Sequence, residues 1–152
     1  MASSRVKCHV FVDFDGTIVP QDATDHILER FADPVWVEVE AEWKAGKIGS
    51  RECLARQIEL LDVAPAELDA TIAAIEMDPG FAAFVEFCRS QDLDVSVLSD
   101  GLDRVVKGVL SRHGLALPVF ANELVSTAAN GWKLNFPHMK PSCVSGAGHC
   151  KC

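Results

Sequence analysis

The sequence predicts an α/β protein with a parallel sheet and a block of helices inserted after the first strand. Two short apolar runs, at residues 10–12 and 93–98, each end on polar residues that are followed by a glycine. Such runs are typical of strands that are buried on both faces of a parallel sheet. The ends of these strands, Asp13 and Ser99, are 86 positions apart. A parallel crossover needs only about a dozen residues, usually in one helix, so the surplus predicts an additional helical unit.

Composition narrows the class of protein. The 152 residues are 49% hydrophobic and 24% charged, with a formal net charge of −8, which fits one soluble globular domain. The acidic balance argues against a nucleic-acid surface, where clustered basic residues are expected. No apolar run approaches the roughly 18 residues of a membrane span, and the N-terminus lacks the apolar core of a signal peptide. We expect a cytoplasmic protein that binds neither nucleic acid nor membrane, and the oligomeric state stays open.

A compact polar motif follows the first strand. Asp13 and Asp15 lie one residue apart, so an extended chain would point both carboxylates to the same side. Gly16 permits a tight turn, and Thr17 supplies a hydroxyl. In parallel sheets the carboxyl ends of the strands form the ligand crevice, which is where this motif would lie. It is either an ordinary polar turn or a nucleophilic carboxylate with an acid–base partner and a divalent metal between them.

Helical patterns fill the stretch between the two strands. Four helices are expected there, at about residues 22–31, 35–43, 50–61 and 65–75. Asp22 or Thr24 would cap the first and Ser50 the third. We interpret residues 21–77 as a helical cap over the crevice, which would exclude water and select the substrate. The alternative is that these helices simply pack on a face of the sheet.

The remaining core would comprise residues 1–20 and 78–152. Beyond the insert we expect a helix at 79–91, a strand at 93–98, a helix at 102–113, a parallel strand at 119–121 and a hairpin at 124–136. The hairpin would turn at Asn130 and Gly131, a favoured pair for a tight connection. The final stretch is rich in turns and cysteine.

A second polar motif ends the second strand. Ser99 occupies the same place on its strand as Asp13 does on the first. The Ser99 hydroxyl, the Gly101 amide and a helix beginning there would form a phosphate cradle, although a simple helix cap explains these residues equally well. Because a carboxylate nucleophile and a phosphate repel each other, a fixed cation is expected. Lys151 is the candidate, and Lys107 on the following helix is the alternative.

The string Asp-Phe-Asp-Gly-Thr-Ile at residues 13–18 resembles the first motif of the haloacid dehalogenase-like hydrolases. Further matching stretches lie at residues 34–36, 46–52, 99–103, 132–138 and 150–151. Together they make the chain similar to the phosphoserine-phosphatase-like branch, and within it to the methionine-salvage phosphatases that act on 2-hydroxy-3-keto-5-methylthiopentenyl-1-phosphate. The resemblance implies a Rossmann-like sheet with an inserted α-helical cap, and a Mg²⁺-dependent phosphatase acting on a small phosphorylated metabolite.

The resemblance also implies roles for individual residues. Asp13 would attack phosphorus and become an aspartyl phosphate, while Asp15 would protonate the leaving alcohol and then activate water. Mg²⁺ would be held by Asp13 and by Asp15 through its backbone carbonyl. The phosphoryl group would be bound by Gly16, Thr17, Ser99, Gly101 and Lys151. An alkoxide leaving group needs a proton and a halide does not, so the presence of Asp15 favours a phosphatase over a dehalogenase.

One departure from the family pattern lies at the end of the chain. The family's fourth motif, an acidic loop that holds Mg²⁺, would follow Lys151, whereas the sequence ends one residue later. We therefore expect a sheet truncated at the C-terminus, weak metal binding and low or no activity. An alternative is a non-catalytic remnant that binds phosphorylated ligands or a partner.

A third hypothesis concerns the cysteine-rich end of the chain. It is either a packed corner or a zinc site. The zinc site would be formed by Cys143, Cys150 and Cys152 with His138 and His149.

Overall fold

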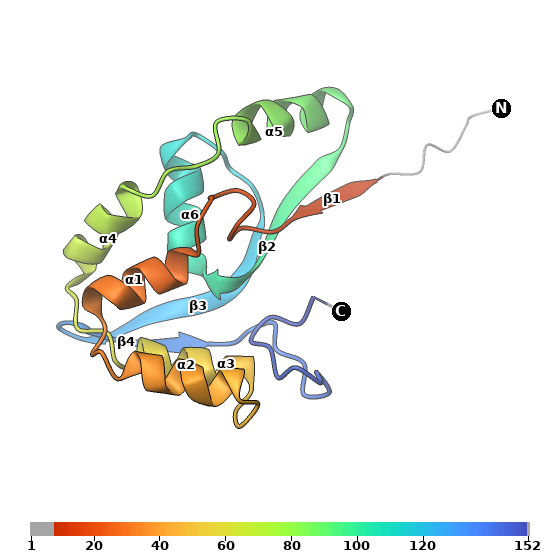
Figure 1. Ribbon diagram of the computed structural model, residues 1–152. Coiled ribbons are helices and arrows are strands. Elements are labelled where there is room, and N and C mark those ends of the chain that lie inside the picture. Colours follow the sequence, from red (N-terminus) through yellow and green to blue (C-terminus); the bar gives the residue numbers. More distant parts are fainter. Residues whose placement is uncertain (1–7, 152) are drawn as a thin grey trace.

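The computed structural model describes residues 8–151, and Figure 1 shows its helices and strands. They are β1 (His9–Val12), α1 (Ala23–Phe31), α2 (Trp36–Lys44), α3 (Ser50–Ile58), α4 (Pro65–Ala73), α5 (Phe81–Ser90), β2 (Asp94–Leu102), α6 (Asp103–Arg112), β3 (Val119–Ala128) and β4 (Gly131–Asn135). The strand order in the sheet is β1-β2-β3-β4, with the first three parallel and β4 antiparallel to β3. The α/β class is confirmed, in the form of a short, mixed sheet.

Strand β1 differs from the expectation of a strand buried on both faces. Val12 packs against the hydrophobic core, whereas Phe11 on the opposite face is 58% exposed. His9 stacks on Phe11 at 4.5 Å and hydrogen bonds to the Ser96 hydroxyl at 2.8 Å. The reason is the position of β1 at the edge of the described sheet, where helices cover one face only (Figure 1).

Strand β3 unites two elements that the sequence predicts separately. Its first residues pair in parallel with β2, and its later residues pair antiparallel with β4. Two polar residues, Asn122 and Glu123, separate the two apolar runs, but the chain stays extended through them. Asn122 is fully buried and donates its side-chain amide to the backbone carbonyl of Asp100 at 2.6 Å. This bond joins β3 to the neighbouring strand at the point where the two apolar runs meet.

The hydrophobic core joins three of the inserted helices to the sheet. Helices α1 and α4, together with Ile58 at the end of α3, contribute buried residues to the same cluster as α6. Helix α4 approaches α6 so closely that a Cβ added at Gly108 would lie 2.7 Å from Cγ2 of Ile72. Helices α2 and α3 pack mainly on each other, and α3 also contacts β4 (Figure 1). The boundary of a cap at residues 21–77 stays a prediction.

The helix starts are only partly as expected. Asp22 caps α1 by accepting the amides of Thr24 and Asp25 at 2.9 and 3.0 Å. The prediction that Ser50 caps α3 is wrong, because Gly49 holds the cap position and Ser50 is the first helical residue. Carbonyls of the C-terminal segment, residues 137–151, accept the first amides of α3 in place of a capping side chain.

All helices within residues 8–151 are short. The longest, α5 and α6, have 10 residues each. None of the described helices combines the length and the apolar character that crossing a bilayer requires.

Candidate active site

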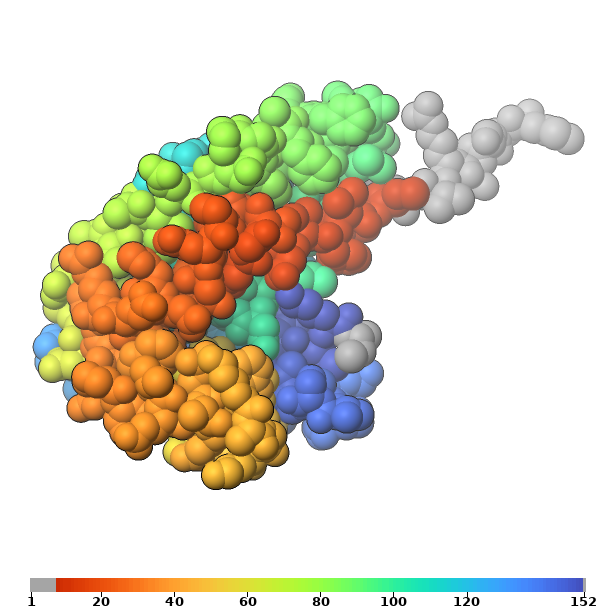
Figure 2. Space-filling view, viewed as in Figure 1, coloured from red at the N-terminus to blue at the C-terminus, as the bar shows by residue number. Residues whose placement is uncertain are grey.

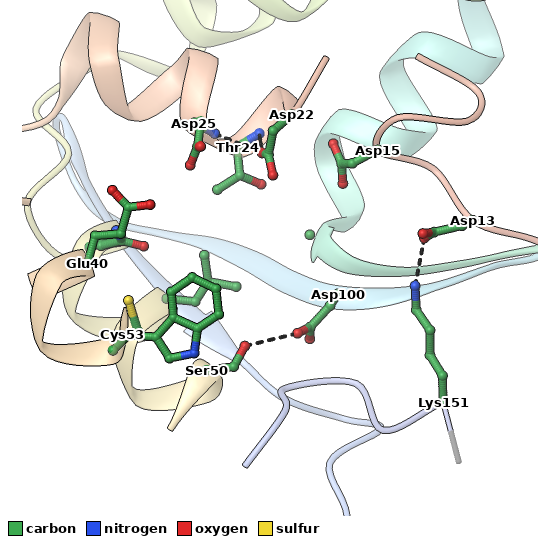
Figure 3. A pocket seen from close by; sticks show the side chains of 14 residues that line it. Asp13, Asp15, Asp22, Thr24, Asp25, Glu40, Ser50, Cys53, Asp100 and Lys151 are labelled. Carbon is green, nitrogen blue, oxygen red and sulfur yellow. Dashed lines mark hydrogen bonds and ion pairs between the residues drawn. The ribbon is translucent and has the colours of Figure 1, made fainter. Parts of the chain in front are cut away.

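A pocket with a volume of about 270 Å³ opens at the carboxyl ends of β1 and β2 (Figure 3). Residues from α1, α2, α3 and the C-terminal segment complete its walls. The lining holds six carboxylates and one lysine. Parallel strands bring their carboxyl ends to one edge of the sheet, so the polar motifs of β1 and β2 meet there.

Asp13 and Lys151 meet at one side of this pocket. The Lys151 ammonium donates to Oδ1 of Asp13 at 2.6 Å, although 138 positions separate the two residues. Lys107 instead pairs with Asp103 on its own helix at 2.7 Å and does not line the pocket. The structure thus places Lys151, rather than Lys107, beside the candidate nucleophile. Both partners are partly exposed, so the ion pair contributes little to folding stability. What matters is that it places a cation beside the candidate nucleophile.

Asp15 lies deeper in the pocket, next to the start of α1. Its Oδ1 accepts the backbone amide of Ala23 at 2.8 Å. Burial raises the pKa of Asp15 to about 6; the Ala23 amide opposes this rise, whereas the neighbouring charges of Asp22 and Asp13 add to it. A carboxyl group that titrates near neutral pH is suited to donate and accept protons in turn.

Ser99 and Gly101 lie beside Asp15. Ser99 is fully buried, and its hydroxyl accepts the Gly101 amide at 3.0 Å. A Cβ added at Gly101 would lie 3.1 Å from the Ser99 hydroxyl, 3.2 Å from Asp15 Oδ2 and 3.3 Å from the Thr24 hydroxyl. Strand β2 runs on past Gly101 to Leu102, and α6 begins at Asp103, one residue later than expected. Gly101 lines the pocket, whereas Ser99 is not among the lining residues.

Gly16 and Thr17 form the turn after β1 and are not among the residues that line the pocket. Gly16 has a φ of +70°, a conformation that favours glycine. The Thr17 amide donates to the carbonyl of Phe14 at 3.2 Å, and Phe14 itself is buried. This turn therefore anchors the strand end that carries both aspartates. A role for Gly16 and Thr17 in binding phosphate stays a prediction.

The inserted segment supplies carboxylates that the sequence analysis did not assign to the pocket. Asp22, Asp25 and Glu40 line the pocket, and Asp25 and Glu40 lie on the side away from Asp13 and Lys151 (Figure 3). Burial, followed by the charges of Asp22 and Glu40, raises the pKa of Asp25. The predicted cap over the crevice indicated that residues 21–77 would contribute to the pocket. Helical spacing alone does not reveal which of its polar residues face inward.

Asp100 is another pocket residue that the sequence analysis did not assign to the site, although it directly follows Ser99. Its carboxylate accepts the Ser50 hydroxyl at 3.2 Å, the His149 amide at 2.7 Å and the Asn122 side-chain amide at 3.2 Å. It thus connects β2 to α3, to β3 and to the C-terminal segment. Asp100 also lines the pocket.

The chemistry of the donors fits Mg²⁺. This hard cation takes oxygen ligands and is commonly bound by one or two carboxylates together with substrate phosphate and water. Asp13 provides one such carboxylate in the pocket, and Asp15, which also lines it, would add its backbone carbonyl oxygen. Within residues 8–151, His, Cys, Asp and Glu side chains form no group of three that could hold a metal ion. A bound Mg²⁺ would therefore depend on the substrate phosphate and water for its other ligands.

The described members of the predicted zinc site have other contacts. Nδ1 of His149 lies 3.0 Å from the carbonyl of Phe120, and its ring lies 4.8 Å from that of His138. The Cys143 sulfur lies 3.2 Å from the Ser145 hydroxyl. Cys152 lies outside the described residues, so a zinc site that includes it stays a prediction.

Fold and site together define an α/β protein with a carboxylate-rich crevice at its strand ends, in which a lysine faces an aspartate. A family profile described as haloacid dehalogenase-like hydrolase matches residues 10–149. The chain belongs to this family, and the resemblance seen in the sequence motifs is confirmed.

Curated relatives agree with this assignment. The 2-hydroxy-3-keto-5-methylthiopentenyl-1-phosphate phosphatase of Brevibacillus brevis is 28% identical over 149 residues, covering 95% of this chain and 67% of the relative. The phosphatase of the same name from Bacillus cereus is 30% identical over 154 residues, covering 96% and 68%. Pdp3-interacting factor 1 of Schizosaccharomyces pombe is 28% identical over 131 residues, covering 84% and 57%. The chain thus spans between 57% and 68% of the length of these relatives.

Solved structures share the fold. A haloacid dehalogenase-family hydrolase from Salmonella enterica serovar Typhi superposes with a TM-score of 0.70 at 19% identity, covering 89% of this chain and 48% of that one. A phosphoserine phosphatase solved as a phospho-aspartyl intermediate analogue gives a TM-score of 0.67 at 23% identity, covering 86% and 64%. At these identities the likeness concerns the fold alone.

Proposed function

We propose that the chain carries the catalytic residues of a phosphomonoester hydrolase that acts through an aspartyl phosphate. The observation that carries this proposal is the Lys151–Asp13 contact of 2.6 Å in the same pocket as Asp15, whose pKa is raised to about 6. An ionised nucleophile, a fixed cation and a carboxyl group able to transfer protons are the parts that this chemistry needs.

In the first step the Asp13 carboxylate attacks phosphorus, and the bond between phosphorus and the ester oxygen breaks. The protonated Asp15 gives its proton to the departing oxygen, so the product leaves as an alcohol. Lys151 offsets the negative charge of the phosphoryl group while Asp13 approaches it. The Gly101 backbone lies close enough to Asp15 and Ser99 to keep this part of the pocket narrow.

In the second step Asp15, now ionised, takes a proton from water. The resulting hydroxide attacks phosphorus, the bond to Asp13 breaks, and inorganic phosphate is released. Mg²⁺, which Asp13 and the backbone carbonyl of Asp15 would hold, supplies further neutralisation of the phosphoryl charge when it is bound.

The substrate we propose is a small phosphorylated metabolite. A pocket of about 270 Å³ accommodates a phosphate with a short organic group. The names of the relatives from Brevibacillus brevis and Bacillus cereus support this class, since both are phosphatases of a small phosphorylated ketone. The carboxylates on the far wall favour an uncharged or hydrogen-bond-donating group over a second anion.

The test compares p-nitrophenyl phosphate with an alkyl phosphate in the presence of Mg²⁺. Asp13→Asn should abolish the hydrolysis of both, and beryllofluoride should bind the parent chain and not this variant. Asp15→Asn should slow the alkyl ester by about 10²–10⁴-fold. It should slow the aryl ester far less, because nitrophenolate departs without a proton.

The two lysines provide a matched control. Lys151→Met should slow turnover by about 10²–10³-fold, as the loss of one charge-stabilising donor does. Lys107→Met removes the same charge outside the pocket and should leave turnover unchanged. Equal effects of the two substitutions, or full activity of the Asp13→Asn variant, would rule the proposal out.

A further inference from the structure

The inserted helices line a side of the pocket that the proposed chemical steps do not use. Figure 3 shows Asp25 and Glu40 across the pocket from Asp13 and Lys151. Figure 2 shows these helices, in orange, next to the segment after β1, in red, and the C-terminal segment, in blue. Five of the lining residues in the inserted helices form what we call the distal wall: Thr24, Asp25, Glu40, Trp43 and Gln57. A substrate whose phosphate lies at Asp13 would point its organic group toward this wall.

Two polar side chains of the distal wall are buried without a hydrogen bond. Thr24 is 8% exposed and Gln57 is 5% exposed. Within residues 8–151, neither the Thr24 hydroxyl nor the Gln57 side-chain amide has a hydrogen-bond partner, and both side chains line the pocket. Buried polar groups are normally paired, because leaving one unpaired costs free energy. The partners of these two groups therefore come from the contents of the pocket.

Asp25 is a carboxylate of the distal wall with no partner among the described residues. Glu40 pairs with Lys44 on its own helix at 2.9 Å. The backbone amide of Asp25 is bound by Asp22, but its side chain has no hydrogen bond or ion pair within residues 8–151. Burial and the charges of Asp22 and Glu40 raise the pKa of Asp25. A cation beside Asp25 would offset this repulsion.

The cation that fits this wall is an ammonium group rather than a metal ion. Within the described part of the chain, His, Cys, Asp and Glu side chains form no group of three that could hold a metal ion. A primary ammonium donates three hydrogen bonds and accepts none. It thereby matches the Asp25 carboxylate, the Thr24 hydroxyl and the side-chain carbonyl of Gln57. Trp43 lines the pocket as well, and an indole ring attracts cations over its face.

We propose that the distal wall binds a primary ammonium group, so that the substrate is the phosphate monoester of a short amino alcohol. This inference rests on the proposed function for the position of the phosphate, and it adds the chemistry of the group at the other end. Of the described residues that line the pocket, Lys151 alone is cationic, and it faces Asp13. A substrate carboxylate would find no cation at the distal wall, so the amino alcohol carries none.

The test compares esters that differ at one group. 2-Aminoethyl phosphate carries an ammonium where propyl phosphate carries a methyl group, and carboxymethyl phosphate carries a carboxylate. Binding is measured by calorimetry with Mg²⁺ on the Asp13→Asn variant, which lacks the nucleophile and so leaves the esters intact. 2-Aminoethyl phosphate should bind about 10–10²-fold more tightly than propyl phosphate, as hydrogen bonds to a charged group allow. Carboxymethyl phosphate should bind most weakly. In the parent chain, kcat/KM should follow the same order.

Two substitutions in the Asp13→Asn background locate the preference. Asp25→Asn removes the charge with little change in shape, and should reduce the ratio of the two dissociation constants about tenfold. Glu29→Gln is the matched control, because Glu29 lies one turn further along α1, is exposed and does not line the pocket. This control should leave the ratio unchanged.

Three results would overturn the proposal. One is that propyl phosphate binds as tightly as 2-aminoethyl phosphate, or that neither binds. Another is an unchanged ratio in the Asp25→Asn variant. The third is an equal loss with Glu29→Gln, which would mean that the acidic surface as a whole, and not the distal wall, attracts the ammonium. Selective binding of 2-aminoethyl phosphate by a parent chain that hydrolyses neither ester would instead refute the proposed function and leave the ammonium site in place.

Discussion

Replacing Gly108 by alanine tests how tightly α4 packs on α6. In an ordinary helix this change stabilises by about 1 kcal/mol, because alanine has the higher helix propensity. Here the new Cβ would lie 2.7 Å from Cγ2 of Ile72, which is 3% exposed and held in the core. Overpacking of this kind costs about 1–3 kcal/mol. We expect a net loss of up to about 2 kcal/mol in the free energy of unfolding.

A double-mutant cycle in urea denaturation separates the gain in helix propensity from the cost of overpacking. Ile72→Ala alone should cost about 2–5 kcal/mol. Combined with Gly108→Ala it should cost about 1–2 kcal/mol less than the sum, because the clashing methyl group is gone. Ile72→Val is the matched control, since valine keeps both γ carbons and should leave the clash in place. A midpoint temperature shift of about 2–4 °C per kcal/mol offers a second readout.

Two outcomes would refute this reasoning. If Gly108→Ala stabilised the protein by the full helix-propensity gain, Ile72 would be free to move aside. If the cycle with Ile72→Ala were additive, the close approach of the two helices would have no energetic consequence. In the control pair, the free-energy costs of Gly108→Ala and Ile72→Val must add. Coupling between these two substitutions would point to a rearrangement elsewhere in the core.

Three further predictions concern single contacts. Trp132→Phe removes the indole N–H that donates to the buried Val63 carbonyl at 2.9 Å, and should cost about 1–3 kcal/mol in urea denaturation. Ser50→Ala removes the bond to Asp100 and should cost about 1.5 kcal/mol in the same assay. The pKa of Asp15 in the folded protein, about 6, exceeds its ordinary value of 3.8. The contribution of Asp15 to stability is therefore present below pH 3.8 and is lost as the pH rises through 6. Asp15→Asn should therefore gain stability over the parent across this range, and urea midpoints that run parallel from pH 3.5 to 7 would contradict the assigned environment.

Much of the site could be predicted because strand ends gather in a parallel sheet. Asp13, Asp15 and Gly101 follow or end apolar strands, and the structure brings them to one pocket. Lys151 could be chosen on chemical grounds, because a carboxylate nucleophile needs a nearby cation. The choice between Lys151 and Lys107 could not come from local pattern, since it depends on where the C-terminal segment folds back.

The remaining features depend on contacts between distant parts of the chain. Phe11 belongs to an apolar run that looks the same in a central strand and in an edge strand, and only the neighbours decide its exposure. Glu40 faces the pocket because of the way in which α2 and α3 pack on each other. Ser50 has the composition of a helix cap, but its hydroxyl is bound to Asp100 while carbonyls from residues 145 and 146 accept the first helix amides.

The open edge of β1 has a practical consequence for handling the protein. Of the described strands, β1 pairs with β2 alone, and the exposed Phe11 lies on it. Such an edge is a template for adding a strand from another copy. The net charge of −8 keeps copies apart, but that repulsion reaches only about 8 Å at physiological ionic strength. Concentrated stocks should therefore stay dispersed in low-salt buffer and self-associate as salt is added. Salt has the opposite effect on a protein whose copies attract each other through complementary charges, because there it weakens the association.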